Sequence, residues 1–220
     1  SVVARGPHLA AIQRDGLRLQ ALDGEMTVRL PAAEDPAALG AQDLVIVSLK
    51  TPALAQAAAT MAPLLHAETA VAFALNGIFW FYGDGFAPQG TTPDTARLDR
   101  DGTLHRLIGA RRSLGMVVLS PNTLVAPGVV RNDRTGNAFV RGEALADRRD
   151  RAPSLAALLD NPGFACRATT DIRREMWLKL IRNAASSPIC CLTGLTVAQA
   201  YGDPARSRSS GSATAGRPGS

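Results

Sequence analysis

The sequence has few of the residues that mark secreted, metal-binding or membrane proteins. Its 220 residues include only three cysteines and three histidines, and the histidines lack the spacing of metal ligands. Three cysteines cannot all pair, and the adjacent Cys190 and Cys191 make a poor disulfide, so we expect reduced thiols in a cytoplasmic protein. No apolar run reaches the roughly 18 residues of a membrane span. We therefore expect neither a metal site nor a membrane partner.

Aromatic residues are also scarce, and this argues against a nucleic-acid surface. They make up 5% of the chain, and the arginines of stretches such as "EALADRRDRA" alternate with acids rather than with aromatic side chains. The formal net charge of +5 depends on three arginines near the end of the sequence, Arg206, Arg208 and Arg217. The rest of the chain is nearly neutral, so no nucleic-acid partner is expected.

The glycine-rich turn Gly-x-Gly-x-x-Gly, which normally opens a dinucleotide-binding domain, is missing too. The nearest match, "GDGFAPQG", has Pro88 at the third glycine position. Both ends of the sequence are unusual, because it begins without Met on the strand-like "SVVA" and its last residues are almost all small or charged. We expect a chain that is incomplete at both ends, with a disordered tail at 205–220.

What is present is a regular alternation of predicted strands and helices. After a short strand at 2–4, a helix ends at Gly16 and a hairpin follows in "LRLQAL" and "MTVRLPA". "DLVIVSLK" and "TAVAFALNG" are continuous apolar runs of the kind found in strands covered on both faces, and an alanine-rich helix separates them. This pattern predicts a doubly wound parallel sheet. Such sheets bind ligands beyond the carboxyl ends of their strands, where Lys50 and Asn76 stand.

The second half of the chain is expected to complete the sheet and then become helical. Residues 106–143 predict short strands with turns at Pro127-Gly128 and at Asp133 to Gly136, interpreted as a further strand and a hairpin that complete the sheet. A helix and a short strand follow. A long helix is expected from Asp171 to about Ser187, where Pro188 should end or kink it. Another helix follows in "TVAQAYGD". We place a domain boundary near residue 168.

The long helix holds a lone lysine, Lys179, within its most apolar part. At 3.6 residues per turn, Lys179, Asn183 and Ser187 recur every four residues and form a polar stripe. A neighbouring stripe, expected to pack into the core, contains Trp177, Leu180, Ile181 and Ala184. An ammonium group at a cleft can stabilise and protonate the oxygen of a ketone that receives a hydride. The alternative is that Lys179 only extends from an amphipathic helix to water.

Several motifs resemble, in the right order over residues 2 to 206, those of the ketopantoate reductases, or 2-dehydropantoate 2-reductases. They are "VVARGPHLAAI", "VSLKT", "FALNGI", "APGVV" and "DIRREMWLKLIRNAASSP" followed by "CLTGLT". The resemblance implies NADPH-dependent reduction of the 2-keto acid ketopantoate to pantoate in pantothenate biosynthesis. It also implies a Rossmann-like parallel sheet, here lacking its first strand, followed by the start of an all-helical domain similar to that of 6-phosphogluconate dehydrogenase.

In these terms residues 1–168 are an N-terminally truncated NADP-binding domain, 169–204 are the start of the helical substrate domain, and 205–220 are the tail. A chain of this kind is expected to have impaired activity. Two alternatives stay open, namely a non-catalytic remnant of the family and a reductase of another small 2-keto acid. A homodimer is also left open.

The resemblance assigns roles to residues in the helix and at one strand end. Lys179 matches the catalytic lysine, and Asn183 matches a substrate-binding asparagine. Ser187 stands where the family commonly has a second asparagine, and its hydroxyl has a shorter reach and fewer donors. Asn76 matches an asparagine near both the nicotinamide and the substrate, although an Asn-Gly pair is also an ordinary turn signal.

Two cations are assigned to the cofactor. Lys50 matches a cofactor-lining lysine, and Arg5 follows the second strand, where NADP enzymes place a cation for the 2′-phosphate and NAD enzymes place an acid. Both could instead be ordinary solvated residues. Glu143, in "VRGE", also lies in a family-like motif but is interpreted as structural.

Overall fold

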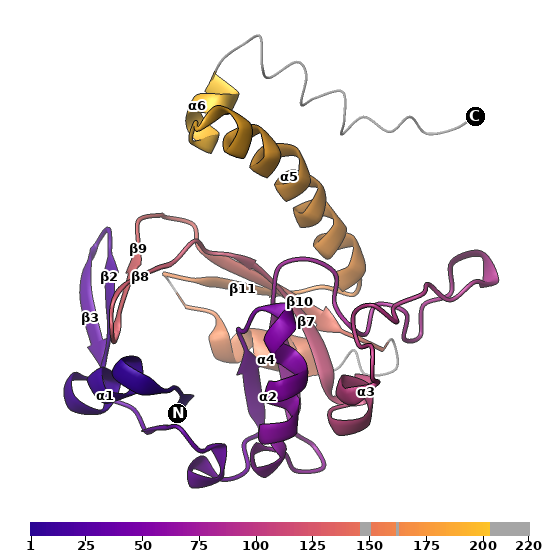
Figure 1. Cartoon of the computed structure of the whole chain (residues 1–220), viewed down its shortest axis with the longest axis horizontal. Helices are drawn as coiled ribbons and strands as arrows, with labels where there is room; N and C mark the ends of the chain where they lie inside the picture. Colours follow the sequence, from indigo (N-terminus) through magenta and orange to yellow (C-terminus); the bar gives the residue numbers. More distant parts are fainter. Residues whose placement is uncertain (146–150, 162, 203–220) are drawn as a thin grey trace. The chain divides into compact units, whose positions relative to one another are not determined.

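The computed structural model describes residues 1–145, 151–161 and 163–202 (Figure 1). The predicted tail at 205–220 lies outside these residues. The chain forms two compact units, one containing Ser1–Leu75 and Phe79–Ile172, the other containing Asn76–Ile78 and the residues from Arg173 onward. In the part described, no helix is both long and apolar enough to cross a membrane. The fold is α/β, as predicted.

The main sheet of the first unit has five strands in the order β11-β10-β7-β6-β5. Strands β5, β6 and β7 are parallel, β10 is antiparallel to β7, and β11 is parallel to β10. Their bounds are Leu44–Val47 for β5, Ala70–Ala74 for β6, Ser113–Leu119 for β7, Ala138–Glu143 for β10 and Ala165–Ala168 for β11. Val71 and Phe73 of β6 and Leu114 and Met116 of β7 are fully buried. Both apolar runs form strands, as predicted, and β6 is buried along nearly its whole length. The expectation that β5 is covered on both faces is wrong, since β5 lies at the end of this sheet and its Ile46 is 42% exposed.

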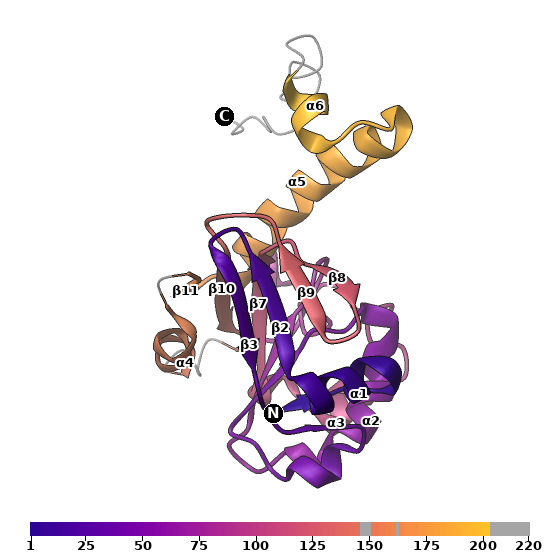
Figure 2. The same cartoon turned by 90° about the vertical axis from the view of Figure 1, so that its left-hand side faces the viewer.

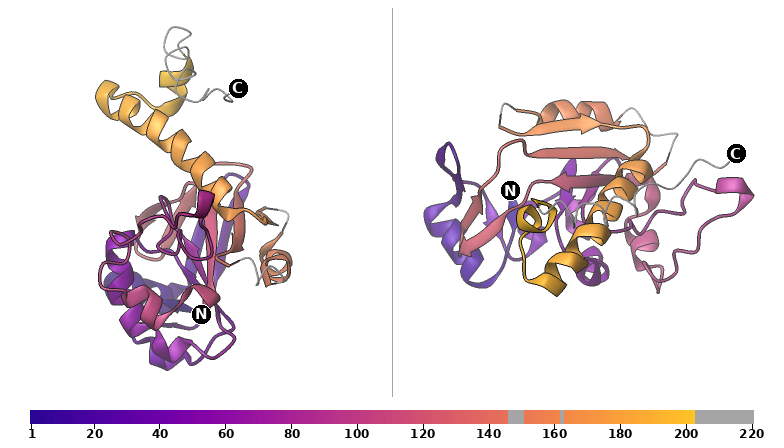
Figure 3. Two further views of the ribbon diagram at one scale, coloured as in Figure 1. Left: turned by 90° about the vertical axis from the view of Figure 1, so that its right-hand side faces the viewer. Right: turned by 90° about the horizontal axis from the view of Figure 1, so that it is seen from above.

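Short helices connect and cover these strands. Between β5 and β6 the chain forms η2 (Thr51–Ala53), α2 (Leu54–Thr60) and η3 (Ala62–Leu64), so the strand–helix–strand unit is confirmed. After β6 come η4 (Pro88–Gly90), α3 (Thr103–Leu107) and η5 (Ala110–Arg112). Helix α4 (Arg151–Leu159) packs beside β11 and β10 (Figure 3), and its Ala152 joins the core around Leu114.

The second sheet contains two hairpins, in the order β3-β2-β9-β8 (Figure 2). The predicted hairpin of β2 (Leu17–Ala21) and β3 (Gly24–Val28) is confirmed, and β8 (Thr123–Ala126) pairs with β9 (Val129–Asn132) around Pro127 and Gly128. The predicted turn at Pro127-Gly128 is confirmed, but the expectation that this region adds a hairpin to the main sheet is wrong, because the hairpin of β8 and β9 belongs to the second sheet. Strand β9 pairs with β2 and β10 pairs with β7, so the segment from Asp133 to Gly136 crosses from one sheet to the other.

A pair of very short strands begins the fold. β1 (Val2–Val3) and β4 (Ala32–Ala33) are parallel, with α1 (Gly6–Asp15) between them in the sequence and η1 (Pro36–Leu39) after them. Helix α1 ends at Gly16, as predicted. Gly16 has φ +87, and a Cβ there would lie 2.9 Å from the Val28 carbonyl oxygen, so both its backbone angle and the close approach of β3 require glycine.

Two glycines on neighbouring strands leave the space that Ile172, the first residue of α5, fills. Gly115 of β7 pairs in register with Gly142 of β10. A Cβ on Gly115 would lie 2.6 Å from Phe79 Cε2 and 2.7 Å from Ile172 Cγ1, while a Cβ on Gly142 would lie 3.0 Å from Ile172 Cβ. The Ile172 side chain, 2% exposed, therefore occupies the space that side chains at these two positions would take.

Helix α5 (Ile172–Thr193) is longer than predicted and less covered. Of the two outcomes expected at Pro188, an end or a kink, the end is wrong, because the helix continues through Pro188, which has no N–H to bond the carbonyl of Ala184. The expectation that its apolar stripe packs into the core is also wrong, since Trp177 is 40% and Ile181 42% exposed. The final described helix is α6 (Val197–Gly202). The three cysteines are free thiols, as expected.

Candidate active site

Lys179 lies two turns into α5 with its side chain half-buried. Burial lowers the pKa of its ammonium group below the ordinary value of lysine, because the charged form loses solvation. A lysine whose proton is held less tightly is a better acid at neutral pH. The environment of Lys179 is therefore the one that a proton-donating lysine needs.

The other residues of the predicted stripe follow Lys179 along the same helix. Asn183 is half-buried and Ser187 is exposed, and they stand one and two turns further on. Asn76 is distant in the sequence, but Asn76–Ile78 forms one compact unit with the residues from Arg173 onward. Gly77 has φ +91, so the chain turns directly after Asn76. All four residues assigned to catalysis and substrate binding thus belong to the same unit.

Arg5 and Lys50 are assigned only to the cofactor, and both belong to the other unit. Lys50 is exposed and directly follows the loop from β5, at the start of η2. Arg5 is exposed and directly precedes α1, whose first turn contains no acidic residue. A helix N-terminus and an adjacent guanidinium both attract a phosphate group.

The described residues fit only part of an NADPH molecule. Arg5 is a cation of the kind that NADP enzymes place for a 2′-phosphate, and Lys50 stands after a carboxyl strand end, where dinucleotides bind to such sheets. The sequence contains no glycine-rich turn for the pyrophosphate. No cradle for the pyrophosphate can therefore be assigned within this chain.

Sequence reasoning missed a histidine that bridges two carboxylates. His105 Nδ1 lies 2.7 Å from Asp99 Oδ2, and its Nε2 lies 2.9 Å from Asp84 Oδ2. Burial opposes the charged ring, but the hydrogen bonds to Asp99 and then to Asp84 outweigh it and raise the pKa of His105. An imidazole that donates from both nitrogens is protonated. One part of this contact was visible in the sequence, namely an aspartate, Asp99, shortly before α3. The other was not, because Asp84 lies 21 residues from His105.

The Asp99 carboxylate also holds the start of α3. It accepts hydrogen bonds from the amides of Leu104 and His105, at 3.0 Å each. Burial alone would raise the pKa of Asp99, but these amides and the His105 ring lower it. The ring of His105 packs edge-on against Trp80, with centroids 4.6 Å apart. These contacts of Asp84, Asp99 and His105, called the His105 clasp below, hold α3 against the aromatic segment Phe79–Phe81. The three residues of that segment are each 1% exposed.

Glu143 has the structural role expected of it. Its side chain is 2% exposed and pairs with Arg151, with Oε2 and Nη2 2.6 Å apart. Arg151 also donates to the Arg111 carbonyl, so this ion pair joins β10, α4 and η5. In the described ranges, no group of three His, Cys, Asp or Glu side chains could hold a metal ion.

Comparison with known proteins places this arrangement in a family. The sequence model described as "Ketopantoate reductase PanE/ApbA" matches residues 1–79. A 2-dehydropantoate 2-reductase of Mesorhizobium japonicum is 38% identical over 205 residues, which cover 92% of this chain and 62% of that protein. The chain belongs to the ketopantoate reductase family. It spans less than two thirds of the length of this relative.

Solved structures agree with the assignment to the ketopantoate reductases. A structure from Ralstonia solanacearum MolK2, assigned as a ketopantoate reductase, matches with a TM-score of 0.83 and 37% identity, covering 95% of this chain and 64% of that one. D-mandelate dehydrogenase, solved with NADH and anilino(oxo)acetate, matches with a TM-score of 0.72 and 16% identity, covering 93% of this chain and 59% of that one. At that identity the likeness concerns the fold alone.

Proposed function

We propose that this protein reduces a small 2-keto acid, ketopantoate, to the 2-hydroxy acid pantoate with NADPH, as a step of pantothenate biosynthesis in the cytoplasm. The observation that carries the proposal is Lys179, a half-buried lysine with a lowered pKa in a chain of the ketopantoate reductase family. Reduction of another small 2-keto acid would use the same groups. The activity of the present chain is expected to be impaired.

The chemistry assigned to Lys179 is proton donation. When bound, NADPH supplies the hydride that adds to the ketone carbon. The carbonyl oxygen then gathers negative charge, which an ammonium group stabilises more strongly than it stabilises the neutral ketone. Lys179 gives a proton to this oxygen and takes one back from water. Partial burial supports this role because it lowers the pKa of Lys179.

Polar side chains of the same unit would orient the substrate. The amide of Asn183 and the hydroxyl of Ser187 follow Lys179 on α5, and both can donate hydrogen bonds to a carboxylate or hydroxyl. Asn76, after β6, is proposed to contact both the substrate and the nicotinamide end of the cofactor. The exposure of Ser187 supports an adaptable role at the edge of the site.

The cofactor is proposed to be NADPH rather than NADH. Arg5 follows β1 where an acidic residue would mark an NAD enzyme. Lys50, after β5, is proposed to line the cofactor. Residues 1–168 would form the Rossmann-like domain without its first strand, and 169–204 would begin the helical substrate domain. The strands β4, β1, β5, β6 and β7 then correspond to positions 3, 2, 4, 5 and 6 of the order 3-2-1-4-5-6.

The test measures ketopantoate-dependent oxidation of NADPH by the purified chain at high enzyme concentration. We expect a slow rate above the enzyme-free control. Lys179→Ala should lower it by roughly 10²-fold or more, the size of a lost general acid. Arg182→Ala, an exposed cation three residues further along α5, is the matched control and should leave the rate unchanged. Equal rates for Lys179→Ala and the wild type would remove Lys179 from this role.

Cofactor binding is measured separately, so that a non-catalytic remnant can be recognised. NADPH should quench the emission of Trp80 or Trp177, and Arg5→Ala should weaken NADPH binding more than NADH binding, because only NADPH carries the 2′-phosphate. Absence of both quenching and turnover would favour the remnant. Equal weakening for the two cofactors would contradict the role of Arg5.

A further inference from the structure

Strand β3 forms one edge of the second sheet (Figure 2). Among the described residues it pairs with β2 only, and this pairing keeps an unbroken register over the five residues of the strand. All five are exposed, including the apolar Met26 at 56% and Val28 at 42%. The strand contains neither proline nor lysine, the residues that commonly protect such an edge. β3 therefore presents a regular, open edge.

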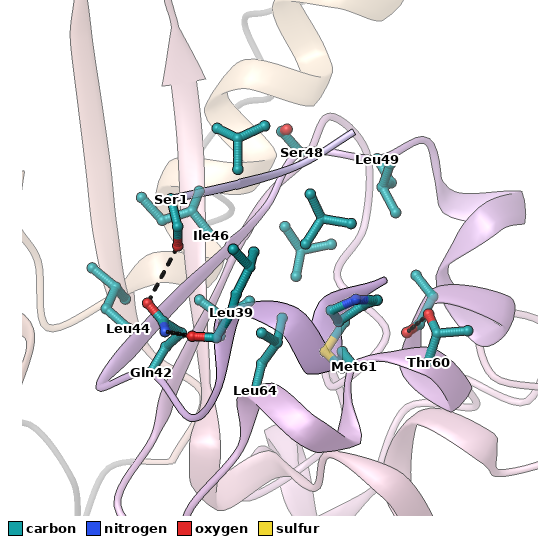
Figure 4. A pocket seen from close by; sticks show the side chains of 16 residues that line it. Ser1, Leu39, Gln42, Leu44, Ile46, Ser48, Leu49, Thr60, Met61 and Leu64 are labelled. Atoms are coloured by element: carbon teal, nitrogen blue, oxygen red, sulfur yellow. Dashed lines mark hydrogen bonds between the residues drawn. The ribbon is translucent and has the colours of Figure 1, made fainter. Parts of the chain in front are cut away.

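The two ends of the main sheet are shielded. At β11 the amide of Ala165 donates to the Asn137 carbonyl on the side of β10, so the amide of Cys166 faces away from β10. The Asp160 carboxylate accepts a hydrogen bond from this outward amide at 2.9 Å. At the other end, β5 lines a cavity of about 310 Å³ that β1 closes on the opposite side (Figure 4). β1 thus restricts the approach of another chain to β5.

Strand β8, at the opposite edge of the second sheet, is protected by its sequence. It lies between Pro121 and Pro127, and its register with β9 shifts between Leu124 and Ala126. Prolines and irregular pairing are the means by which proteins keep an edge strand from pairing with another chain. β3 has neither, so it is the edge of these two sheets to which another strand can add.

The backbone groups of Glu25 and Thr27 lie on the open side of β3. The amide of Arg18 donates to the Gly128 carbonyl at 2.8 Å, so the backbone of Arg18 faces β9 rather than β3. Arg18 stands opposite Thr27 in the antiparallel pair of β2 and β3. Opposite residues either exchange hydrogen bonds or both turn away from each other, so the backbone of Thr27 faces the open edge. Glu25, two residues earlier, faces the same way.

We propose that two copies of this chain associate through β3, with their strands antiparallel about a two-fold axis at Met26. In this register Glu25 stands opposite the partner's Thr27, and the two residues exchange N–H···O bonds in both directions. The symmetry repeats the same bonds on the other side of the axis, and the two second sheets become one continuous sheet. Met26 stands opposite the partner's Met26, so two exposed apolar side chains cover each other.

The side chains favour a second copy of the chain over a strand of another protein. Arg18, Thr27 and Glu25 lie on the same face of the sheet, because Arg18 is opposite Thr27 and Glu25 is two residues from it. In the proposed pair, each Glu25 stands opposite a hydroxyl, and the guanidinium of the partner's Arg18 follows one strand further in the same row. The acid of each copy is therefore matched by a hydroxyl and a cation of the other.

Sedimentation velocity of the purified chain over a range of concentrations tests the association. We expect a monomer–dimer equilibrium without any need for NADPH, so the result is independent of the proposed function. Thr27→Pro removes an N–H from the open edge and none from the pairing with β2, and should weaken the dimer roughly tenfold or more. Leu124→Pro on β8 is the matched control. Leu124 stands opposite Val130, whose backbone faces β2, so this variant also removes only an outward N–H and should dimerise like the wild type.

The residue on the two-fold axis gives a second test, which needs no proline. Met26→Asp and Met26→Lys each place like charges directly opposite across the axis, and each variant alone should dimerise roughly tenfold more weakly or worse. A mixture of the two variants should restore the dimer, because opposite charges then meet at the axis. A chain that stays monomeric at every concentration, an equal loss in Leu124→Pro, or a mixture no better than either variant alone would overturn the proposal.

Discussion

Lys179 makes the proposed chemistry dependent on pH in a definite direction. The ammonium form donates the proton, and burial lowers the pKa of this group. The rate of ketoacid reduction should therefore fall as pH rises through that lowered pKa, at a lower pH than an ordinary lysine would give. The logarithm of kcat measured against pH shows this descending limb. In Lys179→Arg the limb should disappear at whatever rate remains, because a guanidinium keeps its proton. A limb that survives would belong to another group.

The His105 clasp makes folding stability depend on pH. The pKa of His105 is raised in the folded state, so its contribution is complete below the unfolded value of about 6.5 and is lost as pH rises through the folded pKa. The pKa of Asp99 is lowered, so its contribution is complete above the unfolded value of about 3.9 and is lost as pH falls through the folded pKa. Their joint contribution is therefore largest between about pH 4 and pH 6.5.

We expect His105→Gln to remove most of the decline in urea stability that the wild type shows between pH 6 and pH 8. His66→Gln is the control, because His66 pairs with a fully exposed Asp43 and should retain the wild-type slope. The same slope in His105→Gln and the wild type would show that the clasp does not stabilise the fold.

The sequence predicted some of these side chains and not others, for a physical reason. Lys179, Asn183 and Ser187 share one helix, so their spacing alone predicted a common stripe. Asn76 joins their unit through the fold, and only the resemblance to a family linked it to Lys179 beforehand. His105 depends on a partner 21 residues away, and no periodicity reports such a contact.

The packing of Ile172 against strands β7 and β10 depends on the paired glycines Gly115 and Gly142. Gly115→Ala would place a methyl group 2.6 Å from Phe79 Cε2, and overpacking of this kind costs about 1–3 kcal/mol. We expect the urea midpoint to fall accordingly, with an unchanged slope. Gly202→Ala is the control, since a Cβ there meets nothing within 4 Å. Equal stability of Gly115→Ala and the wild type would show that Phe79 and Ile172 move aside easily.

The sequence predicted which segments form helices and strands better than it predicted which strands pair with each other. The apolar runs at β5 and β6 and the hairpin of β2 and β3 follow from local periodicity. The pairing of β9 with β2 does not, because it joins segments more than 100 residues apart. Pro188 misled the prediction of the end of α5, since a proline lowers helix stability without forbidding a helix.

The chain as a whole should show a gradient of protection from hydrogen exchange. Strands β6 and β7 lie inside the main sheet and bury most of their side chains, so their amides should exchange slowest. Within the described part of α5, only Ile172 and Met176 are buried. Amides of α5 beyond Met176 should therefore exchange much faster than those of β6. Mass spectrometry of exchanged peptides measures this difference, and uniform protection along both segments would contradict it.

The order of the motifs along the sequence predicted the family, and the comparisons confirm it. Order is informative because each motif alone is short and common, whereas their succession over most of the chain is not. Substrate and cofactor do not follow from it in the same way. They depend on side chains at Lys179 and Arg5 whose action only ligand binding and kinetics can measure.

The contact of Ile172 with two opposed glycines has a consequence for sequence variation. Because a Cβ on Gly115 would lie 2.7 Å from Ile172 Cγ1, positions 115 and 172 cannot vary independently. Among related proteins, a residue larger than glycine at 115 should occur together with a residue smaller than isoleucine at 172. Position 142 should keep glycine whatever stands at 172, because a Cβ there would lie 2.8 Å from the Thr169 carbonyl oxygen. In the laboratory the same coupling would appear as epistasis, with Ile172→Ala restoring part of the stability that Gly115→Ala removes.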